Sequence, residues 1–136
     1  MPVSSVNYGG GCLCGSVRYE IAGELRQVVH CHCTMCRRHS GAAFLTYAAC
    51  RAEDLRFTAH LPAPYRSSEG ATRTHCERCG SPLTFTSDSD TATVWLTLGS
   101  FDEPERVHPR EHWFIASRLP WLHLDDGLPG WQEFPL

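Results

Sequence analysis

The sequence predicts a mainly β protein of one small domain. Three observations indicate this fold class: many short runs of β-branched and aromatic residues bordered by turn formers, very little helical periodicity, and eight cysteines, seven of them in close groups. At 136 residues the chain has the length of one domain with a single modest core. We therefore expect one domain spanning residues 1–136.

The expected strands follow one another in short runs along the chain. Residues 17–21 alternate apolar and charged side chains, which is the pattern of a strand with one buried face. The later runs are rich in β-branched and aromatic residues and end at Gly, Pro, Asp or Ser. Helical signal is limited to one turn at 34–40, after Cys33, and a second start at Glu53–Asp54. The later runs cover residues 28–31, 43–49, 55–58, 71–75, 83–86 and 93–98.

From about Asp102 onward the chain is rich in proline and tryptophan. Five of the nine prolines and three of the four tryptophans lie in this segment, so it cannot form one long helix. We expect an extended Pro/Trp-rich tail that its aromatic side chains hold against the β core. The alternative is that these aromatic residues stack on a ligand.

Charge and hydropathy exclude several function classes. The formal net charge is −3 and is spread without long runs, so neither nucleic acid nor an anionic membrane is an expected partner. No segment is long and apolar enough to span a bilayer, and residues 1–11 lack the features of a secretory signal. We therefore expect a cytoplasmic protein; the alternative is a secreted chain without its signal. In a reducing compartment, cysteine clusters indicate metal or catalytic sites rather than disulfides.

The spacing of the cysteines predicts two zinc ions per chain. Zinc takes four ligands at tetrahedral corners, and closely spaced cysteines are its usual ligands. Gly15 and Gly80 each follow a grouped cysteine, where a glycine permits a tight turn that points its amide toward a thiolate. Cys50 stands alone in an apolar strand and is expected to be a buried small residue. The groups are Cys12-x-Cys14, Cys31-x-Cys33-x2-Cys36 and Cys76-x2-Cys79.

Spacing alone leaves the division of the seven ligands open. If the two pairs form one closed four-cysteine site, its role is structural, and the triplet at 31–36 keeps a vacant corner, which distinguishes catalytic from structural zinc. In one alternative, a histidine closes the triplet site. In another, part of the triplet binds together with the pair at 76–79. The histidines considered are His32, which strand geometry points away from the metal, His39, which could reach it, and His75.

The same motifs resemble the glutathione-dependent formaldehyde-activating enzyme family, which includes the centromere protein V group. They are residues 10–19 (GGCLCGSVRY), 31–38 (CHCTMCRR), 41–42, 76–83 (CERCGSPL) and 112–121 (HWFIASRLPW). The resemblance implies a β-tent fold and the family's reaction, in which glutathione and formaldehyde give S-hydroxymethylglutathione. It also implies a structural zinc on Cys12, Cys14, Cys76 and Cys79 and a catalytic zinc on Cys31, Cys33 and Cys36.

We therefore expect a carbon–sulfur lyase-type enzyme that adds glutathione or a similar thiol to formaldehyde or a related small aldehyde. A zinc ion with three thiolates is a weak Lewis acid, but it can hold a substrate thiol in its thiolate form. Arg37, Arg38 and Arg51 are candidates to bind the carboxylates of the tripeptide. The alternative for each is an ordinary solvated charge.

Two other classes of function are weighed against the enzyme. One is a non-enzymatic zinc module that binds a protein or a small molecule, or that senses thiol oxidation. The other is a zinc-dependent deaminase, which needs a His-x-Glu element ahead of a Pro-Cys-x-x-Cys pair. Here His75-Cys76-Glu77 overlaps the cysteine pair instead of preceding it, so the deaminase is disfavoured.

Overall fold

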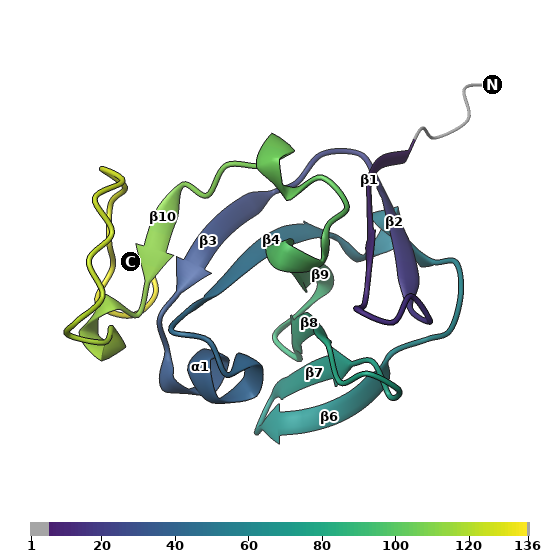
Figure 1. Ribbon diagram of the computed structural model, residues 1–136, viewed down its shortest axis with the longest axis horizontal. Helices are drawn as coiled ribbons and strands as arrows, with labels where there is room; N and C mark the ends of the chain where they lie inside the picture. Colours follow the sequence, from purple (N-terminus) through teal and green to yellow (C-terminus); the bar gives the residue numbers. More distant parts are fainter. Residues whose placement is uncertain (1–5, 136) are drawn as a thin grey trace.

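A computed structural model describes residues 6–135 as two β-sheets (Figure 1). A three-stranded sheet has the order β1-β2-β5, and a seven-stranded sheet has the order β10-β3-β4-β9-β8-β7-β6. The prediction of a mainly β protein of one small domain is confirmed. Residues 1–5 and residue 136 lie outside the described part of the chain. The first five belong to the stretch 1–11, in which the sequence shows no features of a secretory signal. No helix among the described residues has both the length and the apolar character needed to cross a membrane.

The elements are short. The small sheet contains β1 (Val6–Gly11), β2 (Arg18–Ala22) and β5 (Leu55–Phe57). The large sheet contains β3 (Gln27–Cys31), β4 (Leu45–Arg51), β6 (Ala63–Ser68), β7 (Ala71–His75), β8 (Pro82–Ser87), β9 (Asp90–Thr97) and β10 (Glu111–Trp113). Helix α1 (Thr34–Ser40) connects β3 to β4, and 3-10 turns occur at η1 (Ala52–Asp54), η2 (Leu98–Ser100), η3 (Pro104–Arg106) and η4 (Ile115–Ser117).

Three strands were not expected from the sequence, and all three lie at sheet edges. Strand β1 is rich in glycine, β6 contains a proline and mostly polar residues, and β10 lies in the proline-rich segment. Edge strands tolerate such residues because one side of the strand makes no ladder hydrogen bonds. The tail is therefore not simply extended, since β10 pairs in parallel with β3, with Trp113 beside Cys31.

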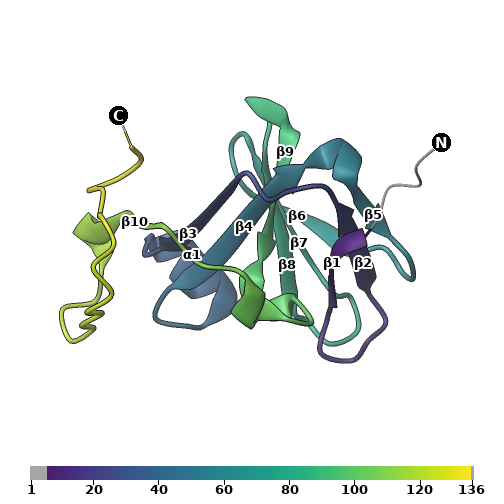
Figure 2. The same ribbon diagram turned by 90° about the horizontal axis from the view of Figure 1, so that it is seen from above.

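The two faces of the large sheet have different partners because successive side chains of a strand point to opposite faces. Ala48 and Leu96 point toward the small sheet and pack with Tyr19 in the main core. Tyr47 and Trp95 point to the other face, where they join a second cluster beside α1. Seen from above, β1 and β2 lie at one end of the molecule and the segment after β10 at the other, with the large sheet between them (Figure 2). The second face carries the site described next.

Candidate metal centres

Four cysteine sulfurs from two distant segments meet at one end of β1. Cys12 and Cys14 follow β1, and Cys76 and Cys79 lie in the turn between β7 and β8. Their sulfur atoms all lie within 4.8 Å of one another, with 3.6 Å between Cys12 and Cys14 and 3.8 Å between Cys14 and Cys76. Tetrahedral zinc with Zn–S bonds of ~2.3 Å places its sulfur ligands ~3.8 Å apart. The spacing of this cluster therefore suits a tetrahedral metal ion as it stands.

The backbone around this four-cysteine cluster is arranged to stabilise thiolates. The amides of Arg78 and Cys79 each donate to the sulfur of Cys76 at 3.3 Å. Gly80, at φ 81°, completes the turn, as its position after a cysteine predicted. The Ser81 hydroxyl and nearby backbone amides lower the pKa of Cys79 to about 5. Burial raises the pKa of Cys12, but hydrogen bonds, led by that of the Val17 amide, outweigh burial and bring it to about 7.

A second cluster, the triplet, forms where β3 leads into α1. Cys31 is the last residue of β3, Cys33 caps the helix by accepting a hydrogen bond from the Cys36 amide, and Cys36 lies in the first turn. The Cys36 sulfur lies 3.0 Å from that of Cys33 and 3.2 Å from that of Cys31. These separations are shorter than the ~3.8 Å of a tetrahedral zinc site. The donor set thus suits zinc, and the three sulfurs must separate slightly to hold it.

The triplet contains no histidine. Within residues 6–135, the groups of potential ligands include three sulfurs here and no imidazole nitrogen. His32 is fully buried, its Nε2 atom lies 2.9 Å from Nδ1 of His112, and it is not part of the sulfur group. Cys76 and Cys79 belong to the four-cysteine cluster. Among the described residues, the structure therefore shows neither a histidine that completes the triplet nor a site shared by the triplet and the pair at 76–79. The binding of zinc and the catalytic role of the triplet stay predictions.

A cavity of about 650 Å³ opens over the triplet, and aromatic side chains form much of its wall. Tyr47 and Trp95 contribute from the large sheet, and Trp113 and Phe134 contribute from the C-terminal segment. The ring centroids are 5.2 Å apart for Trp95 and Trp113 and 5.3 Å apart for Trp113 and Phe134. The tail thus does more than hold itself against the core, because it supplies one wall of this cavity.

Arg73 is a cavity residue that sequence reasoning missed. Its side chain is buried, and its guanidinium donates to the Tyr47 hydroxyl at 2.7 Å and lies 3.8 Å from the Cys36 sulfur. A buried cation beside thiols favours their ionised form. One signal was available: Arg73 lies two residues after Ala71 in an expected strand, so alternation places both on the same buried face.

Comparison with known proteins identifies the family. A family model described as glutathione-dependent formaldehyde-activating enzyme matches residues 7–117. The chain belongs to this family. An uncharacterised lyase of Schizosaccharomyces pombe is 28% identical over 78 residues, which cover 57% of this chain and 56% of the yeast protein, so the match spans about half of that protein's length. The crystal structure of a Rhodobacter sphaeroides protein shares the fold, with a TM-score of 0.57 and 22% identity over 90% of this chain and 98% of the other.

In this member of the glutathione-dependent formaldehyde-activating family, the arginines expected to bind carboxylates lie outside the cavity. Arg51 is exposed at the end of β4 and forms an ion pair with Glu53. Arg37 and Arg38 line an adjoining hollow, which contains Trp121 and shares Thr34 with the cavity. None of the three lines the cavity above the triplet.

Cys50 lies in the main core and belongs to neither cysteine cluster of this family member. It is fully buried in β4 and packs among apolar side chains. Burial, its largest influence, raises the pKa of its thiol to about 12. This agrees with the expectation of a buried small residue and makes Cys50 a suitable control position.

Proposed function

We propose that the protein is a zinc-dependent carbon–sulfur lyase-type enzyme that joins a thiol to formaldehyde or a related small aldehyde, and cleaves the adduct in the reverse direction. One observation carries the proposal: three cysteine sulfurs at a cavity, with no fourth protein ligand among the described residues. An incomplete ligand set is typical of catalytic zinc. The family supplies glutathione and formaldehyde as the reference substrates.

The two clusters would hold two zinc ions with different roles. The complete set, Cys12, Cys14, Cys76 and Cys79, would hold a structural ion that links the end of β1 to the turn between β7 and β8. The triplet, Cys31, Cys33 and Cys36, would hold the catalytic ion. When bound there, zinc supplies a position at which a substrate thiol ionises at neutral pH.

The residues around the triplet are suited to the charge changes of this reaction. The substrate sulfur forms a bond to the carbonyl carbon, and the electron pair of the C=O π bond moves to the oxygen. The oxygen then takes up, by way of solvent, the proton that the thiol released. Burial raises the pKa of Tyr47, so its hydroxyl stays protonated and can donate a hydrogen bond to the developing oxyanion. Arg73 orients that hydroxyl and offsets the negative charge of the thiolates.

The decisive experiment measures zinc content and the rate of adduct formation together. We expect two zinc ions per wild-type chain and an exchange rate between glutathione, formaldehyde and their adduct, followed by NMR, that exceeds the uncatalysed rate. Cys36→Ser should retain one zinc and lose the acceleration, whereas the control Cys50→Ala should retain both. A wild-type protein with two zinc ions and no acceleration by any thiol would instead favour the non-enzymatic zinc module.

We also infer a cytoplasmic location from the state of the cysteines. All eight are unpaired, and both clusters need free thiols to bind metal. Such clusters persist in a reducing compartment and are oxidised outside it.

A further inference from the structure

The cavity above the triplet contains very little charge. The chain has twelve arginines and no lysine, and of the arginines only Arg73 lines the cavity, whose described wall contains no acidic residue and no histidine. Arg73 is already committed, because its guanidinium contacts Tyr47 and Cys36. These contacts use one N–H of each terminal nitrogen, and Nε is enclosed by protein atoms without a hydrogen-bond partner there. Among the described residues, the one cation of the wall thus lies beside the thiols, where its charge offsets theirs.

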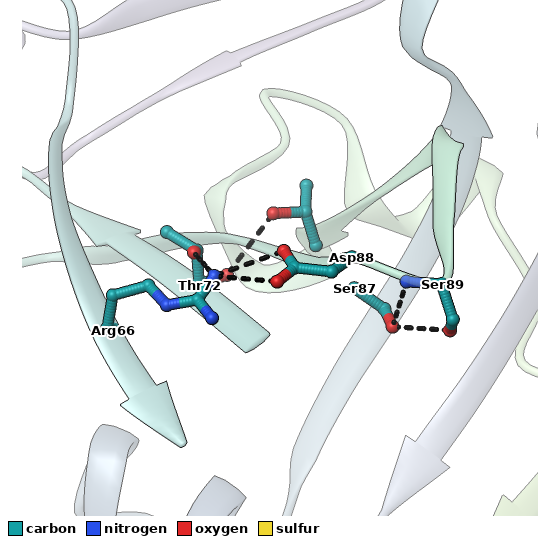
Figure 3. A network of polar contacts seen from close by, with 6 residues as sticks. Arg66, Thr72, Ser87, Asp88 and Ser89 are labelled. Atoms are coloured by element: carbon teal, nitrogen blue, oxygen red, sulfur yellow. Dashed lines mark hydrogen bonds and ion pairs between the residues drawn. The ribbon is translucent and has the colours of Figure 1, made fainter. Parts of the chain in front are cut away.

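The rim of the cavity nearest β8 and β9 also presents no charged side chain among its described lining residues. Ser87 and Ser89 line this part of the cavity, and their hydroxyls lie 2.8 Å apart (Figure 3). Arg66, which lies in the same polar network, binds both carboxylate oxygens of Asp88, at 3.0 and 3.1 Å. That guanidinium is thus paired internally, and the rim offers hydroxyl groups where a charged substrate would need cations.

Glutathione fits such a cavity poorly. It carries two carboxylates and one ammonium group, and a charged group moved from water into an apolar site is costly unless a partner compensates it. The carboxylates would need free arginines or amides in the wall. Of the three arginines that sequence reasoning suggested, Arg51 pairs with Glu53, and Arg37 and Arg38 line the adjoining hollow rather than the cavity itself. The chemistry of the triplet still selects a thiol, because its free position accepts a sulfur ligand.

We propose that the substrate thiol of this protein is uncharged, with an aromatic or branched aliphatic body. This inference rests on the proposed function and specifies its substrate. The thiol R–SH adds to a small aldehyde to give the neutral hemithioacetal R–S–CH(OH)–R′, and the reverse reaction releases both. The body of R lies against the aromatic wall, while its sulfur points to the triplet.

The wall provides the surface that such a body requires. Phe134 is 59% exposed and Met35 is 40% exposed, so two large apolar side chains face solvent at the cavity. Phe134 makes edge-to-face contacts with Trp113 and Phe114, with the Phe114 ring centroid 4.7 Å away. Aromatic rings favour such offset and perpendicular packing. A ligand ring can continue this arrangement and cover apolar surface that otherwise contacts water.

The test compares two thiols on the zinc-loaded full-length protein. Isothermal titration calorimetry gives the Kd of phenylmethanethiol and of glutathione, and NMR exchange gives the rate of addition of each to formaldehyde. We expect phenylmethanethiol to bind at least about tenfold more tightly. Phe134→Ala should weaken its binding about three- to tenfold and leave that of glutathione unchanged. Tyr65→Ala, which removes an exposed aromatic side chain of β6 outside this cavity and outside the hollow at Arg37 and Arg38, is the matched control and should change neither.

A gain-of-function variant gives a second, independent measurement. Phe134→Arg places a cation at the exposed edge of the cavity, and we expect it to strengthen glutathione binding while weakening that of phenylmethanethiol. Tighter or equal binding of glutathione by the wild type would overturn the inference and leave the proposed function standing. Preferential binding of phenylmethanethiol without any acceleration of its addition would support the inference and overturn the proposed function. If neither thiol binds or reacts, both are wrong.

Discussion

Arg73 on β7 donates a 2.7 Å hydrogen bond to the hydroxyl of Tyr47 on β4, across the two strands that separate them in the large sheet. The contact directs a buried guanidinium toward the triplet, where it lies 3.8 Å from the Cys36 sulfur. The Phe85 ring, 4.9 Å from the guanidinium carbon, packs against it. The positive charge is thus set close to the thiols by two side chains that are not expected to bind metal.

Removing this charge should weaken metal binding at the triplet. For Arg73→Met we expect zinc affinity at the triplet to fall about 10- to 100-fold, as is typical when a group that supports metal ligands is lost. Competition with a chromogenic chelator measures the effect, and the four-cysteine site, which Arg73 does not contact, serves as an internal reference. Arg66→Met is the control, because Arg66 is exposed and paired with Asp88. Equal zinc affinity in the wild type and Arg73→Met would show that the guanidinium does not support the thiolates.

The two cysteine clusters should differ in their importance for folding. Cys76→Ser removes a proposed zinc ligand that is 1% exposed and whose cluster joins segments about sixty residues apart. We expect the loss of one zinc and a loss of about 2–5 kcal/mol in the free energy of unfolding, as when a structural cross-link is removed. Cys33→Ser should also lose one zinc but keep a cooperative unfolding transition near that of the wild type. Zinc analysis and urea denaturation followed by circular dichroism distinguish the two. Equal destabilisation by both variants would contradict the separation of structural and catalytic roles.

Gly10 should be intolerant of any side chain. A Cβ atom there would collide with the Tyr19 hydroxyl and the Ser100 carbonyl oxygen, both held in the core beside β1. For Gly10→Ala we expect a loss of about 1–3 kcal/mol in the free energy of unfolding, the usual cost of overpacking. Gly99→Ala is the matched control, since nothing lies within 4 Å of the position its Cβ would take. Equal free energies of unfolding for the two variants in chemical denaturation would contradict the close contact between β1 and Tyr19.

The Arg18–Asp102 pair should make a pH-dependent contribution to stability. Arg18 donates hydrogen bonds of 2.9 and 2.6 Å to the two oxygens of Asp102, which lowers the pKa of that carboxyl below its ordinary value of 3.8. Because the pKa is lower in the folded state, the stabilisation is present above about pH 4 and is lost as the pH falls through the lowered pKa. Both side chains are roughly half exposed, so the contribution is at most about 1 kcal/mol.

The measurement compares the unfolding free energies of the wild type and Asp102→Asn from pH 7 down to pH 3. Release of metal at low pH affects both proteins, so the difference between them is the informative quantity. This difference should be constant between pH 5 and 7 and shrink below pH 4, while the exposed control Asp125→Asn should show no such trend. A difference that grows on acidification would contradict the assignment.

The sequence by itself determined the local features of this protein. The alternation at 17–21, the glycines after Cys14 and Cys79, and the spacing within each cysteine group depend on backbone geometry over a few residues. The structure agrees with each of them. The buried position of Cys50 followed for the same reason, since an apolar strand buries a small residue in its middle.

Only the tertiary structure decided which distant groups share a site. The parallel pairing of β10 with β3 and the approach of Arg73 to the triplet depend on strand order in the large sheet. Spacing left the grouping of Cys12 with Cys76 open and the family resemblance implied it; the fold brings their sulfurs together. Spacing within a short segment does not report which strands become neighbours in a sheet. In addition, an edge strand such as β10 has few apolar residues, so its sequence does not mark it as a strand. The aromatic cavity, on which the proposed choice of substrate rests, arises from side chains that the fold alone brings together.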